Sequence, residues 1–559
     1  MLLDLLTTES NLSLGRVAVF AVIAGLSDAL IIVVINHAAE ASSRGEPQFL
    51  LLFFFLVVLG TYVFTQRYIL RRSTSLIENT IRRIRIRLTD KIRKADLLPL
   101  EKLGRSDIYA GINRDTVAIS QATAPLIIAC QSALMVFFTI FYIGYLSLQA
   151  LLLTLGVIAL GVFVHFRRLR GIMDRLRTAS ARETQFFEAL THLLDGFKEV
   201  KLSRARSRDL FLHLQNIAIS AAEFKTEANI NLADQYLFSQ ASLSVLVAVV
   251  VFVLPVLSTT ESSRIIAITA AVQFVSGPLQ SLVAAIPTFS NANVAAANIT
   301  HLEHALEELK SRAEDKLQAV ELRERERFRR IHCDNVTMHY TDAHGEHLFT
   351  VGPLRMSLKK GETIFIIGGN GSGKSTFLKL LTGLYYPVSG AIFLDGIDIE
   401  TYGYPAYREL FSAIFSDYHL FDRLYGLRAD EARVNELLRL MQLEDKTLYV
   451  DGRFENQDLS SGQRKRLALI VSLLEDKPIY VFDEWAADQD PSFRRYFYEE
   501  ILTNLKKSGK TVIAATHDDR YFHVADRVLK MDMGRFVSLG NARSGQLPGP
   551  RRRGRTLPV

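Results

Sequence analysis

The residues best suited to chemistry form a glycine-rich loop that follows an apolar segment and precedes a helical one. From Ile364 to Thr376 the chain reads IFIIGGNGSGKST, so that four residues separate Gly368 from Gly373-Lys374-Ser375. In such a loop the backbone N–H groups surround phosphates, the lysine reaches the outer phosphates, and the serine hydroxyl can ligate Mg²⁺. The sequence therefore predicts nucleotide binding by Gly368, Asn370, Gly371, Ser372, Gly373, Lys374, Ser375 and Thr376.

A pair of carboxylates at the end of a second apolar strand is the next chemical signal. The segment KPIYVFDEW ends its apolar run at Asp483 and Glu484. Asp483 suits a Mg²⁺ shell, whereas Glu484 is placed to orient or deprotonate an attacking water. Two acids after a strand can also simply begin a loop, but downstream of a phosphate-binding loop the catalytic interpretation is favoured.

The segment DLSSGQRKRLALI, Asp458–Ile470, resembles the signature sequence of ABC ATPases, with Ser461 where glycine is commoner. Small residues at a helix start let Ser460 and Gly462 approach a γ-phosphate held by the opposite subunit, and the helix dipole favours that anion. Gln463 completes this predicted contact, and ATP and Mg²⁺ are the ligands that the resemblance implies.

Three further residues follow in the order expected of this family. Tyr340, in VTMHY, matches the aromatic residue that stacks on adenine, and Asp490 matches the loop after the catalytic acid. His517, in VIAATHDD, matches the histidine that contacts the γ-phosphate, which makes His517 and Glu484 the predicted catalytic pair. A lone Tyr or His is usually structural, so these roles depend on the resemblance.

One departure concerns the metal. Where the family has a Gln that reaches Mg²⁺, FSAIFSDYHLFD places Ser416 and then Asp417. Ser416 can hold the metal through a water, or Asp417 can substitute. Together with LSSGQRKRLAL, FDEWAADQDPSFRRYFYEEIL and ATHDDRYFHVADRVLKMDMG, this segment resembles the bacterial cyclic-peptide export group, which includes exporters linked to pyoverdine, syringomycin-type lipopeptides and a lasso microcin.

The elements that must position these residues begin with a membrane half. Hydrophobic residues make up 49% of the 559-residue chain and concentrate before about residue 300. Spanning a bilayer takes roughly 20 residues. Six segments meet that requirement: Leu14–His37, Phe49–Leu70, Ala124–Leu146, Leu148–His165, Tyr236–Leu257 and Arg264–Phe289.

Two long charged loops, Arg71–Thr123 and Arg167–Gln235, separate these spans unevenly. Their Lys and Arg residues predict that both loops and both chain ends are cytoplasmic. The resemblance to bacterial exporters implies that the protein lies in the bacterial inner membrane. Each loop is expected to turn near Pro99–Ser106 or Thr191–Gly196 and to contact the ATPase there. The net charge of +7 is explained by these loops, so no nucleic-acid partner is predicted.

The predicted fold is multidomain. An all-α six-helix transmembrane domain of the ABC exporter type, 1–310, and a linker, 311–330, precede an α/β P-loop ABC nucleotide-binding domain, 331–540, and a basic tail, 541–559. A signature sequence cannot reach its own phosphate loop in this architecture, so a homodimer in the lipid bilayer is expected.

The predicted function is ATP-driven export of a peptide-like cargo, namely a cyclic peptide, a lipopeptide or a peptide siderophore. The alternatives are a flippase or a siderophore importer of the same fold, and an ATP-gated regulator with little turnover. Asp28 is the residue predicted to lie in the cargo path. It is an intramembrane carboxylate that costs roughly 2.5–3.5 kcal/mol at the bilayer centre, so it requires a partner or a watery cavity.

Overall fold

The computed structural model describes residues 14–44, 48–103, 108–257, 262–308, 328–341 and 346–537. These residues divide into two compact units. The helical unit contains the described residues up to 90 and within 105–305, and the α/β unit contains those within 91–104 and from 306 onward. The predicted tail, 541–559, and the predicted linker up to 327 lie outside the described residues.

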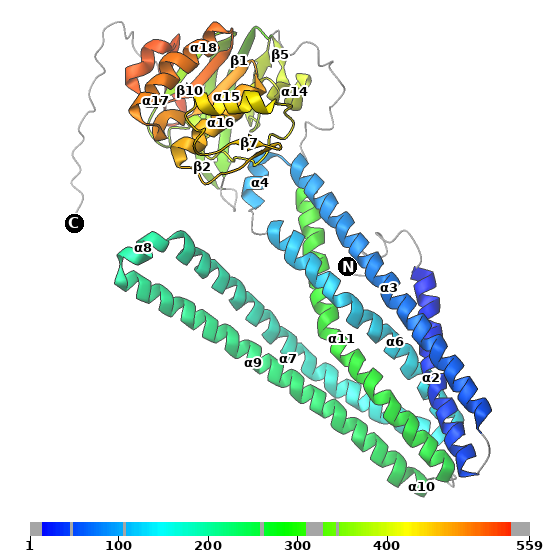
Figure 1. Ribbon diagram of the computed structural model, residues 1–559. Helices are drawn as coiled ribbons and strands as arrows, with labels where there is room; N and C mark the ends of the chain where they lie inside the picture. Colours follow the sequence, from blue (N-terminus) through cyan, green and yellow to red (C-terminus); the bar gives the residue numbers. More distant parts are fainter. Residues whose placement is uncertain are drawn as a thin grey trace. The chain divides into compact units, whose positions relative to one another are not determined.

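The helical unit consists of long helices joined by short turns (Figure 1). Helix α9, the π-helical turn η2 and α10 follow one another without a break. The elements are α2 (Leu14–Ser43), α3 (Phe49–Lys94, whose last residues belong to the α/β unit), η1 (Ala110–Asp115), α6 (Thr116–Leu146), α7 (Leu148–Asp195), α8 (Phe197–Leu202), α9 (Arg204–Ala248), η2 (Val249–Val253), α10 (Leu254–Leu257) and α11 (Ser262–Glu308).

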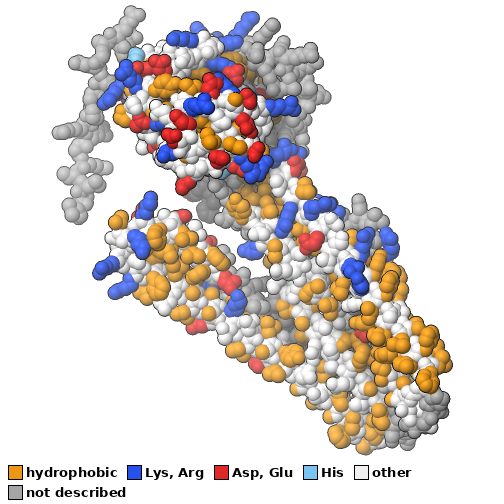
Figure 2. Space-filling view, viewed as in Figure 1, with side chains coloured by type: hydrophobic (Ala, Val, Ile, Leu, Met, Phe, Trp, Pro, Cys, Tyr) orange, Lys and Arg blue, Asp and Glu red, His pale blue; other side chains and the backbone are white. Residues whose placement is uncertain are grey.

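Apolar surface covers much of this unit. Figure 2 shows hydrophobic side chains over its helices and charged side chains over the α/β unit. Phe49 and Leu50 of α3 are exposed by 84% and 68%, as expected of side chains that face lipid. Among the described residues, five helices are long and apolar enough to cross a membrane, whereas the fourth predicted span corresponds to a shorter apolar stretch, Leu148–Val164, at the start of α7. Five of the six predicted spans are thus recovered by length and composition, and the fourth stays a prediction.

The turns of the helical unit follow local capping chemistry. The predicted hairpin at Ser147 is confirmed, because this extended residue separates α6 from α7 and its side chain accepts a hydrogen bond from the Ala150 N–H at 3.3 Å. The second turn lies slightly later than predicted. Thr191–Asp195 is still helical, Gly196 ends α7, and the chain reverses through α8 into α9. Figure 1 shows α7 and α9 side by side, diverging from α6 and α11 toward α8.

The α/β unit contains two main sheets. One sheet has the antiparallel order β2-β1-β4-β5, and the other has the order β12-β11-β3-β10-β9-β6, parallel except for β12. The strands are β1 (Arg330–Thr341), β2 (His347–Lys359), β3 (Thr363–Ile367), β4 (Ser389–Leu394), β5 (Ile397–Asp398), β6 (Phe411–Ile414), β7 (Tyr449–Val450), β8 (Arg453–Phe454), β9 (Ile479–Asp483), β10 (Thr511–Ala515), β11 (Arg527–Asp532) and β12 (Arg535–Val537). The helices are α4 (Leu97–Leu103), α12 (Lys374–Leu381), α13 (Ile399–Tyr402), α14 (Tyr404–Arg408), α15 (Glu431–Leu440), α16 (Ser461–Glu475), η5 (Trp485–Asp488), α17 (Pro491–Tyr496), η6 (Phe497–Ile501), α18 (Leu502–Lys507) and η7 (Asp519–Val524).

The parallel sheet explains how distant motifs meet. Strands β9 and β10 are buried at every position, which matches their continuous apolar sequences. Because β3, β10 and β9 are neighbours and parallel, their carboxyl ends lie at one edge of the sheet. The loop after each strand therefore contributes to the same site.

Helix α4 belongs to the α/β unit although it follows α3 in the chain. Leu97 and Leu98 pack against the core of that unit. The Tyr385 hydroxyl donates to Glu101 Oε2 at 2.7 Å, and the Tyr386 hydroxyl donates to Asp96 Oδ1 at 2.8 Å. The predicted contact between the turn of the first long loop and the ATPase is thereby confirmed.

Candidate nucleotide-binding and catalytic site

The phosphate-binding loop joins β3 to α12. Gly368 follows β3 directly and has a φ of 155°, and a Cβ at this position would lie only 2.2 Å from the carbonyl oxygen of Met531 in β11. A larger residue would push the loop away from the sheet. The loop then places Lys374 and Ser375 in the first turn of α12. The predicted strand–loop–helix context is confirmed.

Lys374 is the charged centre of the site. Its side chain is only 4% exposed, and its Nζ donates to the carbonyl oxygens of Gly368 at 2.9 Å and Gly369 at 3.1 Å. The same nitrogen lies 3.2 Å from Glu484 Oε1 and 3.3 Å from His517 Nε2. A buried ammonium held in this way has a fixed position from which it can meet a phosphate.

Glu484 and His517 meet above this lysine. Glu484 follows β9 in a left-handed conformation with a φ of 50°, and His517 follows β10. His517 Nε2 lies 3.1 Å from Glu484 Oε1. Burial raises the pKa of Glu484, but the hydrogen bonds and charge of Lys374 and His517 outweigh it, so the pKa lies below the ordinary value. The carboxylate is therefore ionised and able to accept a proton or orient a water.

Asp483 occupies the last position of β9 and is 1% exposed. Neither carboxylate oxygen has a hydrogen-bond partner of standard geometry among the described residues. Burial raises the pKa of Asp483, partly opposed by the nearby Ser375 hydroxyl and Ser416 backbone. Unsatisfied carboxylate oxygens beside a serine hydroxyl are the donor set that Mg²⁺ takes in phosphate-transfer sites, so these residues fit the metal.

The two substitutes for the missing Gln lie differently. Ser416 follows β6, the neighbour of β9, and approaches Asp483 through its backbone. Asp417 is directed toward Lys379, with 3.7 Å between Oδ2 and Nζ. Lys379 also pairs with Glu101 of α4, 3.2 Å away. Ser416 is thus beside the proposed metal position, while Asp417 is engaged on the side facing α4; their assignment to the metal stays a prediction.

The other predicted nucleotide contacts in this part of the chain are Tyr340 and the remaining residues of the phosphate-binding loop. Tyr340, near the end of β1, is half-buried, and its hydroxyl lies 3.1 Å from Thr376 Oγ1. This contact brings the predicted adenine-stacking residue to the phosphate-binding loop. Ser372 is 5% exposed and its hydroxyl has no partner among the described residues. The turn before it contains Asn370 and Gly371, and the latter has a φ of 74°.

The signature segment begins α16. Ser460 caps this helix, since its hydroxyl accepts from the Gln463 N–H and its own N–H donates to Gln463 Oε1 at 3.0 Å. A Cβ on Gly462 would lie 2.7 Å from the carbonyl oxygen of Asp488. Only glycine therefore lets the helix start pack against the loop that follows Glu484.

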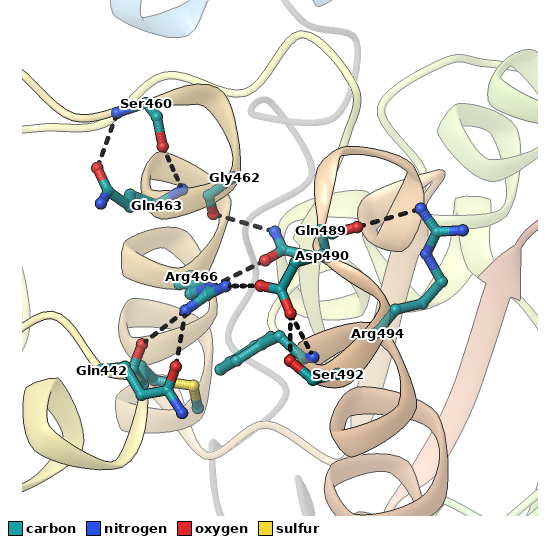
Figure 3. Close-up of polar contacts among 11 residues, drawn as sticks. Gln442, Ser460, Gly462, Gln463, Arg466, Gln489, Asp490, Ser492 and Arg494 are labelled. Carbon is teal, nitrogen blue, oxygen red and sulfur yellow. Dashed lines mark hydrogen bonds and ion pairs between the residues drawn. The ribbon is translucent and has the colours of Figure 1, made fainter.

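A polar network that the motifs do not reveal joins this helix to that loop (Figure 3). Gln489, 4% exposed, donates through Nε2 to the Gly462 carbonyl at 3.0 Å and accepts from Arg466 Nε at 2.9 Å. Arg466 also pairs with Asp490. Asp490 further accepts hydrogen bonds from Ser492 and from the Phe493 N–H, which caps α17 and lowers the pKa of Asp490 to about 2.

Lys465 is a second residue of this region that sequence reasoning missed. Although charged, it is 6% exposed. Its Nζ donates to the Glu484 carbonyl oxygen at 2.9 Å and pairs with Asp488 Oδ2 at 2.9 Å, while its own carbonyl accepts from Trp485 Nε1. The available signal was a Lys within the helix that follows the signature, because a buried lysine needs partners. Lys465 thus holds the backbone of the residue predicted to be catalytic.

Comparison with known proteins agrees with this geometry. Residues 351–487 match the ABC transporter family, and residues 14–206 match the ABC transporter transmembrane region. The chain is 35% identical to the ATP-binding protein SyrD of Pseudomonas syringae pv. syringae, over 82% of each chain. It is 25% identical to the subtilin transport ATP-binding protein SpaT of Bacillus subtilis, over 80% of this chain and 75% of that one. A bacterial Atm1-family ABC exporter with ATP bound has the same fold, with a TM-score of 0.75, 17% identity and 95% of each chain covered.

The chain belongs to the ABC transporter family. It is an ABC exporter in which an N-terminal transmembrane region is fused to an ATP-binding domain, and ATP hydrolysis by that domain is coupled to transport. It is a multi-pass membrane protein. The protein family, the fold class and the enzyme class predicted from the sequence are confirmed.

Proposed function

We propose that two copies of this chain form an exporter that moves a peptide-like cargo out of the cytoplasm across the bacterial inner membrane. The cargo class is a cyclic peptide, a lipopeptide or a peptide siderophore. The α/β unit and both chain ends lie in the cytoplasm, as the Lys- and Arg-rich loops favour. The observation that supports turnover most directly is the cluster of Lys374, Glu484 and His517 at one edge of the parallel sheet.

In this proposal each residue of the cluster has one task. Lys374 binds the outer phosphates, and the ionised carboxylate of Glu484 orients the attacking water and accepts its proton. His517, in contact with Glu484, holds the γ-phosphate end of the site. Tyr340 stacks on adenine, and the loop from Gly368 to Thr376 surrounds the phosphates with its N–H groups.

Asp483 and Ser375 would hold Mg²⁺, with Ser416 able to reach it through a water. When bound, this ion neutralises charge on the transferred phosphoryl group. Asp483 is suited to the task because its carboxylate is buried and its oxygens have no hydrogen-bond partner of standard geometry among the described residues.

A second chain is needed to complete each site. Among the described residues, the polar contacts of Ser460 and Gly462 outside the backbone ladder of α16 are with Gln463, Arg464 and Gln489, and none is with the phosphate-binding loop. The start of α16 is therefore available to a γ-phosphate held by the partner. In the helical unit, the α8 turn presents Phe197 and Leu202, exposed by 50% and 89%, which suits contact with a second copy.

The cargo assignment is supported by sequence relationships. The segments around Ser416, Ser460, Glu484 and His517 resemble the cyclic-peptide export group, and one relative is named for subtilin transport. SyrD matches across both the transmembrane and the ATPase regions, so the likeness is not confined to the ATPase.

The test is ATP hydrolysis by the full-length protein in proteoliposomes, with a cyclic lipopeptide, a peptide siderophore or a bacterial lipid added. We expect the first or second to stimulate turnover and Glu484→Gln to reduce it by about 10²–10⁴-fold. Glu499→Gln, which changes an acid paired with Arg495 on the outside of the same unit, is the matched control. Stimulation by the lipid alone would favour a flippase, and a wild-type protein without turnover would favour an ATP-gated regulator.

A further inference from the structure

A polar cavity lies within the helical unit, between four helices. It has a volume of about 240 Å³. At the roughly 30 Å³ that each molecule occupies in liquid water, this is room for about eight waters or for one long side chain. Helices α2, α3, α6 and α11 contribute its lining, which consists of Ala24, Gly25, Asp28, Tyr62, Gln66, Ile128, Gln131, Ser132, Met135, Gly277, Pro278 and Ser281.

Asp28 is the only charged side chain among the described residues that line this cavity. It is half-buried, and no hydrogen bond or ion pair to it is found within the part of the chain that the structure describes. Intramembrane carboxylates normally pair with a cation or face a water-filled path. Because no cation of the described residues lines the cavity, Asp28 has the second kind of environment, and its negative charge is available to a ligand that enters the cavity.

Two amide atoms in the same lining also lack partners. Gln131 is 8% exposed and its Nε2 has no hydrogen-bond partner among the described residues; the same is true of Gln66 Oε1. Buried polar atoms are nearly always hydrogen-bonded, so unpaired ones indicate a missing ligand or water. Pro278 adds to this pattern because it has no N–H to donate to the carbonyl of Phe274, one turn earlier in α11.

These groups define the chemistry of a ligand. The carboxylate of Asp28 and the oxygen of Gln66 accept hydrogen bonds, as a positively charged amine requires, whereas the unpaired N–H of Gln131 donates, as a carbonyl oxygen requires. A basic amino-acid residue within a peptide carries both features: an ammonium or guanidinium at its tip and peptide carbonyls at its base. A purely apolar group would leave the polar atoms of the lining without partners, and an anionic group would be repelled by Asp28.

We propose that this cavity is a specificity site that binds a cationic side chain of a peptide-type cargo, with Asp28 as its counter-ion and Gln131 as donor to a peptide carbonyl. The inference rests on the proposed function for its cargo class. It concerns equilibrium binding without ATP, so its failure can be told apart from a failure of ATP-driven export.

The experiment uses the full-length protein in lipid nanodiscs and two small cyclic peptides that differ only in charge. These are cyclo(Lys-Leu) and the same peptide acetylated on its Nε, and binding is followed by saturation-transfer NMR. We expect saturable binding of cyclo(Lys-Leu) to the wild type and at least tenfold weaker binding of the acetylated peptide. Asp28→Asn should weaken cyclo(Lys-Leu) at least tenfold and leave the acetylated peptide unaffected.

Two further variants sharpen the result. Gln131→Leu should weaken both peptides, because both carry the carbonyl that Gln131 would bind. Glu40→Gln, an acid-to-amide change in the same helix α2 at a residue paired with Arg44, should bind both as the wild type does. Equal binding of cyclo(Lys-Leu) to the wild type and to Asp28→Asn, or no saturable binding to the wild type, would overturn the proposal. Comparison of the two peptides on the wild type tests the charge requirement without any substitution.

Discussion

The buried lysines beside the nucleotide site and the carboxylate that lines the helical cavity are held in opposite ways. In the α/β unit, Lys374 and Lys465 are 4% and 6% exposed, and each has several partners within hydrogen-bonding distance. In the helical unit, Asp28 lines a cavity and has no described partner. A paired network fixes geometry before a ligand arrives, which suits a reaction on one invariant substrate. An unpaired charge takes its partner from the ligand, which suits the selection of a cargo.

The same contrast appears in what each unit exposes. Charged side chains are denser on the α/β unit, and apolar ones are denser on the helices (Figure 2). On the charged surface of the α/β unit a lone carboxylate would be solvated and would not indicate a functional site. Within the apolar helices a carboxylate costs free energy, so its presence indicates a function.

The largest effect is expected at Asp483, the exception within the α/β unit, because its carboxylate has no hydrogen-bond partner of standard geometry in the described structure. Asp483→Asn should reduce Mg²⁺-dependent ATP hydrolysis by at least about 100-fold, since the proposed metal ligand is lost. It should also raise the melting temperature of the nucleotide-free protein at neutral pH. Trp485, the single tryptophan of the chain, is buried beside this site, so its fluorescence can report the melting.

The pH dependence gives the sign of that stabilisation. Burial raises the pKa of Asp483 above its ordinary 3.8, so the wild-type fold is penalised as pH rises through the folded-state pKa and the carboxyl ionises. Asparagine cannot ionise, and the advantage of the variant should therefore shrink toward acid pH. Asp445→Asn, at an exposed position of the same unit, should show neither change. A variant that melts below the wild type at neutral pH would mean that the carboxylate is paired after all.

The next effect is expected at Lys465, which supports Glu484 without belonging to the nucleotide site. Lys465→Met removes the donor to the Glu484 carbonyl and the partner of Asp488. Displacement of a catalytic group by about 1 Å can cost about 100-fold, so we expect kcat to fall about 10–100-fold with little change in the KM for ATP. The unsatisfied carbonyl should also cost about 1–3 kcal/mol of stability.

Lys477→Met is the matched control for this substitution. Lys477 pairs with Glu409 at 2.6 Å, but both side chains are partly exposed, and such surface pairs contribute about 0–1 kcal/mol. A general loss of stability without a fall in kcat would make Lys465 merely structural. Equal kcat for the two variants would show that Lys465 does not position Glu484.

Which residues of the α/β site meet could be predicted from the sequence, because the motifs that form the site are contiguous. Gly368, Lys374 and Asp483 lie in short motifs whose strand and helix context follows from local apolar patterns, and the structure brings them together. Gln489 and Lys465 were missed because their roles arise only when α16 packs against the loop after β9. Burial of a polar residue is a tertiary property that no local pattern records.

In the helical unit the sequence predicted elements better than sites. Apolar length identified the spans, and Ser147 identified a hairpin, but Thr191–Asp195 was assigned to a turn although it continues α7 to Gly196. Asp28 stood out by its charge alone. The cavity around it is formed by four helices that are far apart in the sequence, so Gln66 could not be grouped with it beforehand.

A smaller effect is expected from Gln489, which joins the signature helix to the loop after Glu484 (Figure 3). Gln489→Leu leaves the Gly462 carbonyl and Arg466 Nε without this partner and should cost about 1–2 kcal/mol. Gln489→Glu keeps the acceptor for Arg466 and loses only the donor to Gly462, so it should lose less. Melting followed by Trp485 fluorescence ranks the variants, and a larger loss for Gln489→Glu would show that charge, not the bond to Gly462, dominates here.

The smallest effect tests where the boundary between the units lies. The Tyr385 hydroxyl donates to Glu101 Oε2 of α4 at 2.7 Å, and burial raises the pKa of Tyr385, so this hydroxyl remains a donor. A double-mutant cycle of Tyr385→Phe and Glu101→Gln should give a coupling of about 0.5–1.5 kcal/mol in melting, with the exposure of Glu101 favouring the lower end. The cycle also separates this bond from the ion pair that Glu101 makes with Lys379, because Tyr385→Phe leaves that pair intact. Additive effects would mean that this bond contributes nothing and that α4 is held by its other contacts, namely Leu97, Leu98 and the Tyr386–Asp96 hydrogen bond. A measurable coupling would show that the α/β unit binds α4 through directed polar contacts, the same means by which it fixes its own buried charges.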